Sequence, residues 1–407
     1  MPRTVRRRGA GKHGSRIGLA LAGGGPVGAV YEVGALCALQ DALEGIDFTD
    51  LDIYVGVSSG AFVASLLANG FTPADLREIL VEAASPKHAL DHQVFLTPAL
   101  GEFAQRTGAL PRLALEMLWH RAREAVGAGA KAAGAAAAAS VMGSAIPTGF
   151  FDNERMARFL ERAFRTGGRS NDFRALRHRL RVIATDLDTS EAAEFGAPGL
   201  DRVPISRAVQ ASAALPLLYP PVEIGGRHYV DGALRKTLHA SVALREGARL
   251  VICVNPIIPF HAGRAARRGR GARDRIIDRG LPAILSQSFR TLIYSRMERA
   301  MEGYARQYPR ASLLLFQPKR NEGEMFFTNV FNDADRHEVF ERAYRSTLRD
   351  VAARRRELAP KLRRHGISIR PRPLPRAPAP RPPRPAPRAM TSLSRTLERL
   401  ERWKGRR

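Results

Sequence analysis

Short apolar runs alternate with helix-length amphipathic segments over the first 70 residues. Residues 17–22 form an uninterrupted apolar run and residues 52–55 predict a second strand, as expected for strands of a buried parallel sheet. Residues 27–43 and 61–68 carry apolar side chains at helical spacing. Two strand–turn–helix units in succession predict parallel strands joined by helical crossovers.

The rest of the pattern predicts an α/β chain with a large insertion. Residues 107–149 are rich in Ala and Gly, and we expect either a lid over the core or a plain surface helix. Other predicted elements are strands at 180–184, 227–230 and 249–254, a helix from Asp152 or Asn153 to Phe164, and a long helix after Pro282. Residues 371–388 alternate Pro with Arg and Ala, which predicts a disordered linker, and residues 391–403 predict a short basic helix.

The net charge of +26 over 407 residues is concentrated in three segments. Residues 1–16, 263–280 and 370–407 carry most of it, so the remainder is nearly balanced. Such basic segments attract anionic lipid headgroups or nucleic acid. We expect peripheral contact with anionic membranes and no nucleic-acid partner, with a solvated Arg-rich composition that binds nothing as the alternative.

The same composition indicates a reducing compartment. Cys37 and Cys253 are the two cysteines, which is too few for a disulfide framework. The basic start has no apolar segment followed by a small-residue cleavage site, so we expect no cleaved signal peptide. No run of 18 apolar residues predicts a membrane span. A cytoplasmic or peripheral membrane location follows, and the oligomeric state stays open.

Two glycine-hinged turns carry the candidate chemistry. Residues 23–28 follow the first strand, and Gly56-Val57-Ser58-Ser59-Gly60 follows the second. The second turn reads G-x-S-x-G, which exposes a serine hydroxyl on a strand-to-helix elbow. Because turns after parallel strands meet at the carboxyl edge of the sheet, the amides of Gly24, Gly25 and Ser59 are expected to surround an oxyanion formed when Ser58 attacks an ester.

Ser58 needs a base, and the sequence offers two classes of candidate. A Ser–Asp–His triad in hydrolase order would use one of the later histidines, none of which lies in a turn that recommends it: His239, His261, His337 or His365. His228 lies close to Asp231 but is typical of a structural strand residue. Asp231 ends a predicted strand and precedes Gly232, so its carboxylate is suited to accept the serine proton in a dry pocket.

These residues together resemble the patatin-like phospholipases. The resemblance covers about residues 17–245 and depends on four places: the loop Gly23, Gly24, Gly25 and Gly28, the elbow from Gly56 to Gly60, the segment 206–221, and Asp231-Gly232-Ala233. It implies a three-layer α/β/α sandwich with a mainly parallel sheet. It also implies a Ser58–Asp231 dyad, an oxyanion loop at residues 23–28, lipid acyl esters as substrates, and no metal or other cofactor.

The resemblance also implies a domain organisation and has one departure. We expect a basic disordered N-terminus at 1–16, a catalytic domain at 17–245, a mainly helical companion region at 246–366 and a disordered tail at 367–407. The family often has Arg or Lys before the last glycine of its oxyanion loop, where this chain has Val27. The headgroup preference, the acyl-chain length and the position cleaved are not predicted.

Three other functions compete with a lipid hydrolase. Gly23, Gly25 and Gly28 also fit G-x-G-x-x-G, and Asp47, Asp50 and Asp52 follow at about the distance of a dinucleotide site. A Rossmann-type protein would leave Ser58 and Asp231 unexplained. A non-catalytic membrane adaptor would use only the basic segments. An α/β-hydrolase with a hidden histidine would place its elbow after more strands than precede Ser58.

Overall fold

The computed structural model describes residues 16–82, 97–98, 148–149, 151–216, 218–258, 281–319 and 333–374. The predictions for the lid, the Pro/Arg-rich linker, the terminal helix and most of the basic segments lie outside these residues. Its strands are β1 (Ile17–Leu21), β2 (Leu43–Glu44), β3 (Ile53–Val57), β4 (Thr97–Pro98), β5 (Phe151–Asp152), β6 (Arg179–Asp186), β7 (Ala192–Phe195), β8 (Val222–Ile224), β9 (Arg227–Asp231), β10 (Leu250–Val254), β11 (Ser312–Phe316) and β12 (Ser368–Ile369).

The helices follow the strands in the alternation that the sequence predicts. The α-helices are α1 (Gly25–Ala42), α2 (Ser59–Ala68), α3 (Pro73–Arg77), α6 (Glu154–Phe164), α7 (Ile205–Ser212), α8 (Ala240–Arg245), α10 (Leu281–Gln307), α11 (Asp333–Ala353) and α12 (Arg355–Arg363). A π-helical turn, η1 (Glu78–Glu82), continues α3, and two 3₁₀ turns are η3 (Phe173–Ala175) and η4 (Gly232–Leu234).

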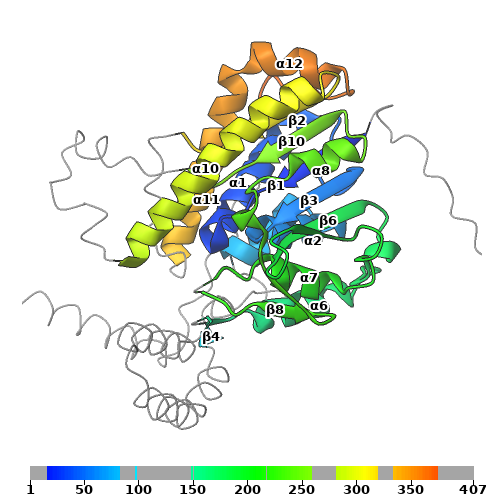
Figure 1. The fold of residues 1–407 in the computed structure, drawn as a ribbon. Helices are drawn as coiled ribbons and strands as arrows, with labels where there is room; N and C mark the ends of the chain where they lie inside the picture. The colour runs from blue at the N-terminus through cyan, green and yellow to red at the C-terminus, as the bar shows by residue number, and fades with distance from the viewer. Residues whose placement is uncertain are drawn as a thin grey trace, which may run out of the picture.

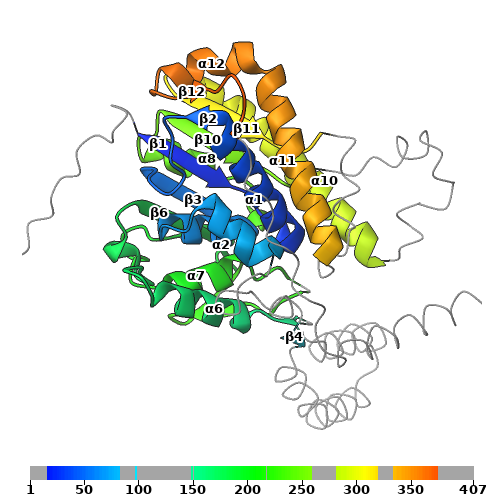
Figure 2. The ribbon, with the colours of Figure 1, turned by 180° about the vertical axis from the view of Figure 1, so that it is seen from behind.

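The central sheet has the order β11-β10-β1-β3-β6-β9-β8, with β7 also paired to β6. The five strands from β11 to β6 are parallel, whereas β7, β8 and β9 pair antiparallel. Figure 1 shows α8 and α10 in front of the sheet, and Figure 2, from behind, shows α1, α2 and α11 in front of it. The predicted three-layer α/β/α fold with a mainly parallel sheet is confirmed.

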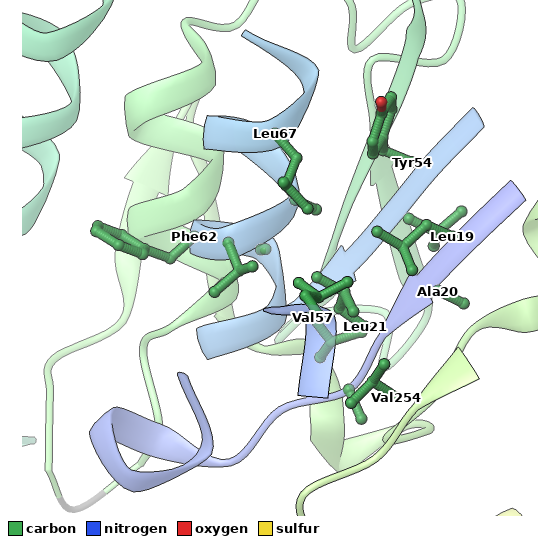
Figure 3. Packing of buried hydrophobic residues seen from close by; sticks show 14 of the residues in the cluster. Leu19, Ala20, Leu21, Tyr54, Val57, Phe62, Leu67 and Val254 are labelled. Atoms are coloured by element: carbon green, nitrogen blue, oxygen red, sulfur yellow. The ribbon is translucent and has the colours of Figure 1, made fainter. Parts of the chain in front are cut away.

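The core lies on both faces of the parallel strands. Every residue of β1, β3 and β10 is buried, which explains why these strands are continuous apolar runs. Figure 3 shows Leu21 of β1 and Val57 of β3 in this core, with Phe62 on α2. Burial of each such side chain contributes roughly 1.5–3 kcal/mol to folding. The core therefore fixes the strand ends from which both glycine turns emerge.

The region beyond residue 245 also builds the sheet. β10 pairs with β1, and β11 pairs with β10 at the edge. On the face of the sheet that Figure 2 shows in front, α11 packs on α1. At this contact a Cβ added at Gly34 would lie 2.7 Å from the carbonyl oxygen of Phe340. The sheet thus runs across the predicted boundary at residue 245, and the domain boundaries themselves stay a prediction. No helix within the described ranges is long and apolar enough to span a bilayer.

Candidate active site

Ser58 lies on a strained elbow between β3 and α2. Its φ of 53° and ψ of −121° are unusual for a residue with a side chain, and such a conformation costs roughly 1–3 kcal/mol. The turn is also crowded: a Cβ at Gly56 would lie 2.4 Å from the carbonyl oxygen of Gly60, and a Cβ at Gly60 would lie 2.6 Å from that of Leu21. The two glycines of the G-x-S-x-G pattern are therefore needed for close approach of the backbone.

The sharp turn at Ser58 follows from how two strands share one edge of β6. β3 pairs with β6 as far as Val57 opposite Ile183, and β9 begins to pair at the next position, Asp231 opposite Ala184. β7 pairs with the same stretch of β6 and occupies its other edge. β3 and β9 therefore run toward each other along the remaining edge. Because neighbouring positions on a strand are about 3.3 Å apart, β3 cannot continue, and Ser58 meets Asp231 where the two strands end.

Asp231 is buried beside the serine. Its carboxylate lies close enough to the Ser58 hydroxyl for that group to favour the ionised form, and Oδ1 accepts the backbone N–H of Ala233 at 2.8 Å. Burial raises the pKa of Asp231 to about 6, although the Ala233 N–H and the nearby Ser58 hydroxyl act to lower it. A Cβ at Gly232 would lie 2.3 Å from the carbonyl oxygen of Ile183, so glycine is required directly after Asp231. The carboxylate is thus ionised at neutral pH and more basic than a surface aspartate.

The glycine loop lies against the serine. A Cβ at Gly23 would be 3.1 Å from the Cβ of Ser58 and 3.8 Å from its Oγ. Gly24 precedes α1 and Gly25 begins it with a positive φ of 61°, while Gly28 lies one turn further on. No side chain caps the start of α1, so the first amides of this 18-residue helix, at its positive end, have no side-chain partner. This end of the helix is suited to stabilise a negative oxygen on a group attacked by Ser58.

The alternative bases and acids lie elsewhere. His261 is outside the described residues, and no histidine in the described part of the chain is hydrogen bonded to Ser58 or Asp231. Burial lowers the pKa of His239 to about 3, so that histidine is neutral. Asp52 accepts the backbone N–H of Ile17 at 2.8 Å, at the start of β1. Asp50 pairs with His178, just before the start of β6. Both acids therefore lie at the opposite end of the strands from the glycine loop, where they do not fit a dinucleotide site.

Two residues near the dyad were not identified from the sequence. Ser212, the last residue of α7, accepts the backbone N–H of Ser58 at 2.8 Å. Burial raises the pKa of Tyr219, and the negative charge of the nearby Asp231 carboxylate raises it further. Both lie in the segment 206–221 that carries part of the family resemblance, but a lone serine in a helix and a tyrosine before two prolines give no independent signal.

Comparisons with known proteins find a matching family model and similar solved structures. A family model described as patatin-like phospholipase matches residues 19–244. No curated protein matches the sequence significantly. Similar solved structures include VipD from Legionella pneumophila, at 14% identity and a TM-score of 0.36, with 83% of this chain and 67% of VipD covered.

Two further structures complete the comparison. ExoU from Pseudomonas aeruginosa, solved with SpcU, shares 14% identity at a TM-score of 0.29, with 84% of this chain and 52% of ExoU covered. Human GIVD cytosolic phospholipase A2, solved with methyl gamma-linolenyl fluorophosphonate, shares 15% identity at a TM-score of 0.32, with 84% of this chain and 58% of the human protein covered. The chain thus spans about half to two thirds of the length of these three proteins.

Proposed function

The chain belongs to the patatin-like phospholipase family, and from this premise we propose that it is a lipid acyl hydrolase with a Ser58–Asp231 dyad. Membership of the family supports hydrolysis of lipid esters. The observation that supports the dyad is the buried carboxylate of Asp231 beside the Ser58 hydroxyl, at the point where β3 and β9 end against β6. A nucleophile beside a base of raised pKa is the arrangement that acyl transfer requires.

In the proposed first step, Ser58 Oγ attacks the acyl carbonyl carbon while its proton passes to the Asp231 carboxylate. The carbonyl oxygen becomes negative and accepts hydrogen bonds from amides of the glycine loop, Gly24 and Gly25, and from the amide of Ser59. Loss of one such donor typically lowers turnover by about 10²–10³-fold. The tetrahedral species then collapses, the ester C–O bond breaks, and Asp231 returns the proton to the leaving alcohol.

The second half of the reaction reuses the same carboxylate. Asp231 removes a proton from water, the resulting hydroxide attacks the acyl-serine, and the bond between Ser58 Oγ and the acyl carbon breaks. The proton returns to Ser58, and the fatty acid is released. A pKa of about 6 suits Asp231 to both roles, because a base works best when its pKa lies near the working pH.

Release of fatty acid from phospholipid vesicles tests this function. Wild-type protein should release fatty acid, Ser58→Ala should abolish the release, and Asp231→Asn should lower it by about 10²–10⁴-fold, the usual contribution of a general base. His239→Ala serves as the histidine control and should retain activity unless folding is lost. Unchanged release by the Ser58→Ala variant would refute the proposal.

A further inference from the structure

The strained backbone of Ser58 is held from outside its own turn. The Ser212 hydroxyl accepts the Ser58 backbone N–H at 2.8 Å and donates to the carbonyl oxygen of Ile183 at 2.5 Å. Ser212 has no exposed surface, so water does not replace either bond. One hydroxyl therefore joins the end of β3, the end of α7 and the edge of β6 at the point where Ser58 leaves the sheet.

The same short segment also holds the other member of the dyad. The carbonyl oxygen of Ala214, two residues after Ser212, accepts the backbone N–H of Asp231 at 2.9 Å. Asp231 is further fixed on β6, since its own carbonyl oxygen accepts the Thr185 hydroxyl at 3.1 Å. Residues 212–214 thus accept the backbone N–H groups of both Ser58 and Asp231.

The carbonyl group of Ile183 lies next to Ser212, which holds Ser58, and next to Gly232, which follows Asp231. It accepts the Ser212 hydroxyl, and it is also the group that a side chain at position 232 would strike at 2.3 Å. The absence of a side chain at Gly232 therefore lets Asp231 approach without displacing the carbonyl that orients Ser212. This contact links the D-G-A motif to the elbow through a residue that belongs to neither.

We infer that Ser212 is a positioning residue, whose hydroxyl fixes the Ser58 amide and so directs the Ser58 side chain toward Asp231. The expected effect on catalysis rests on the proposed function, whereas the expected effect on the Ser58 backbone does not. The inference also indicates which backbone amide of the elbow binds an oxyanion. The N–H of Ser58 already donates to the Ser212 hydroxyl, so the elbow contributes the N–H of Ser59. Removal of the hydroxyl leaves both the Ser58 N–H and the Ile183 carbonyl without a partner in a dry site.

The test compares Ser212→Ala with Ser65→Ala. Ser65 is equally buried, and its hydroxyl bonds only to Phe62 of its own helix, which makes it a matched control. With a soluble ester, Ser212→Ala should lower kcat by about tenfold to a hundredfold, the effect of a small misplacement of a reacting group. KM should stay within about twofold, because substrate binding is unchanged. Ser65→Ala should keep the wild-type kcat.

A second variant and a second readout keep the outcome informative. Ser212→Thr retains the hydroxyl and should recover part of the lost kcat, which a purely structural role would not predict. Hydrogen exchange followed by mass spectrometry should show the amide of Ser58 exchanging more than about tenfold faster in Ser212→Ala than in Ser65→Ala. This readout applies even if Ser212→Thr does not fold.

The outcomes separate this inference from the proposed function. If wild-type protein hydrolyses no ester, the proposed function fails, while faster exchange at Ser58 would still support the role of Ser212. If wild-type protein is active and Ser58→Ala is inactive, yet Ser212→Ala keeps kcat within about twofold of the control, the inference about Ser212 is overturned. Unchanged exchange at Ser58 would overturn it as well.

Discussion

Replacement of Asp231 by Asn should strongly lower activity and yet stabilise the fold at neutral pH. Burial raises the pKa of this carboxylate from 3.8 to about 6, so the folded state binds its proton more tightly than the unfolded state does. The contribution of Asp231 to stability therefore falls as the pH rises from about 4 to about 6, and the full cost is present above that range. Asn carries no charge, retains an acceptor for the Ala233 N–H, and escapes this cost.

The magnitude follows from the pKa difference. A shift of about two units corresponds to about 3 kcal/mol at pH 7.5, and to roughly 1.5 kcal/mol at pH 5, where the folded-state carboxyl group is already largely protonated. The stability gain of Asp231→Asn over wild type should thus roughly double between pH 5 and pH 7.5.

Urea denaturation followed by circular dichroism at both pH values measures this difference. Asp186→Asn is a suitable control because Asp186 lies at the end of the neighbouring strand β6. Its pKa is lowered by the backbone N–H groups of Thr189 and Asp188 and by Arg227. Loss of this carboxylate should therefore destabilise the protein, and more so as the pH rises through the range in which aspartate ionises. A gain for Asp231→Asn that is absent, or equal at pH 5 and pH 7.5, would refute a raised pKa at Asp231.

Three further predictions concern the rate, the elbow and the membrane. The kcat should be half-maximal near pH 6 and fall about tenfold per pH unit below it, because only ionised Asp231 acts as a base, so a profile flat down to pH 5 would contradict this role. Gly60→Ala should cost about 1–3 kcal/mol in urea denaturation and abolish activity, because its Cβ meets backbone of β1, whereas Gly70→Ala, at a φ of 83° with open space, should cost about 1 kcal/mol and stay active. Deletion of residues 375–407 should weaken co-sedimentation with anionic vesicles, and unchanged binding would reject membrane contact through the basic tail.

The sequence predicts four of the five parallel strands, β1, β3, β6 and β10, because these are encoded locally, but it misses β11 in the region expected to be mainly helical. β1 and β10 are continuous apolar runs, and β3 and α2 flank a glycine turn, so spacing and composition suffice. The antiparallel strands carry weaker signals: β8 is three residues long, and the pairing of β9 with β6 joins residues over 40 positions apart. The sequence of either segment alone therefore could not predict that β3 ends where β9 begins to pair with β6.

The candidate site also contains residues that the sequence predicts and one that it does not. Ser58 and Asp231 are recognisable because glycines flank or follow them. Where close backbone contact requires a glycine, that glycine is visible in the sequence. Ser212 acts through one hydroxyl between two backbone groups, which imposes no spacing on its neighbours. Its role depends on where α7 ends relative to β3, and that relation is set by packing of the whole sheet.

The most direct test of the account is the site and base dependence of fluorophosphonate labelling. Mass spectrometry of digested protein should locate one adduct, on Ser58. The adduct should be absent from Ser58→Ala, strongly reduced in Asp231→Asn, and retained in each histidine-to-alanine variant. An adduct on another residue, or a histidine variant that loses labelling as completely as Ser58→Ala does, would contradict the Ser58–Asp231 dyad.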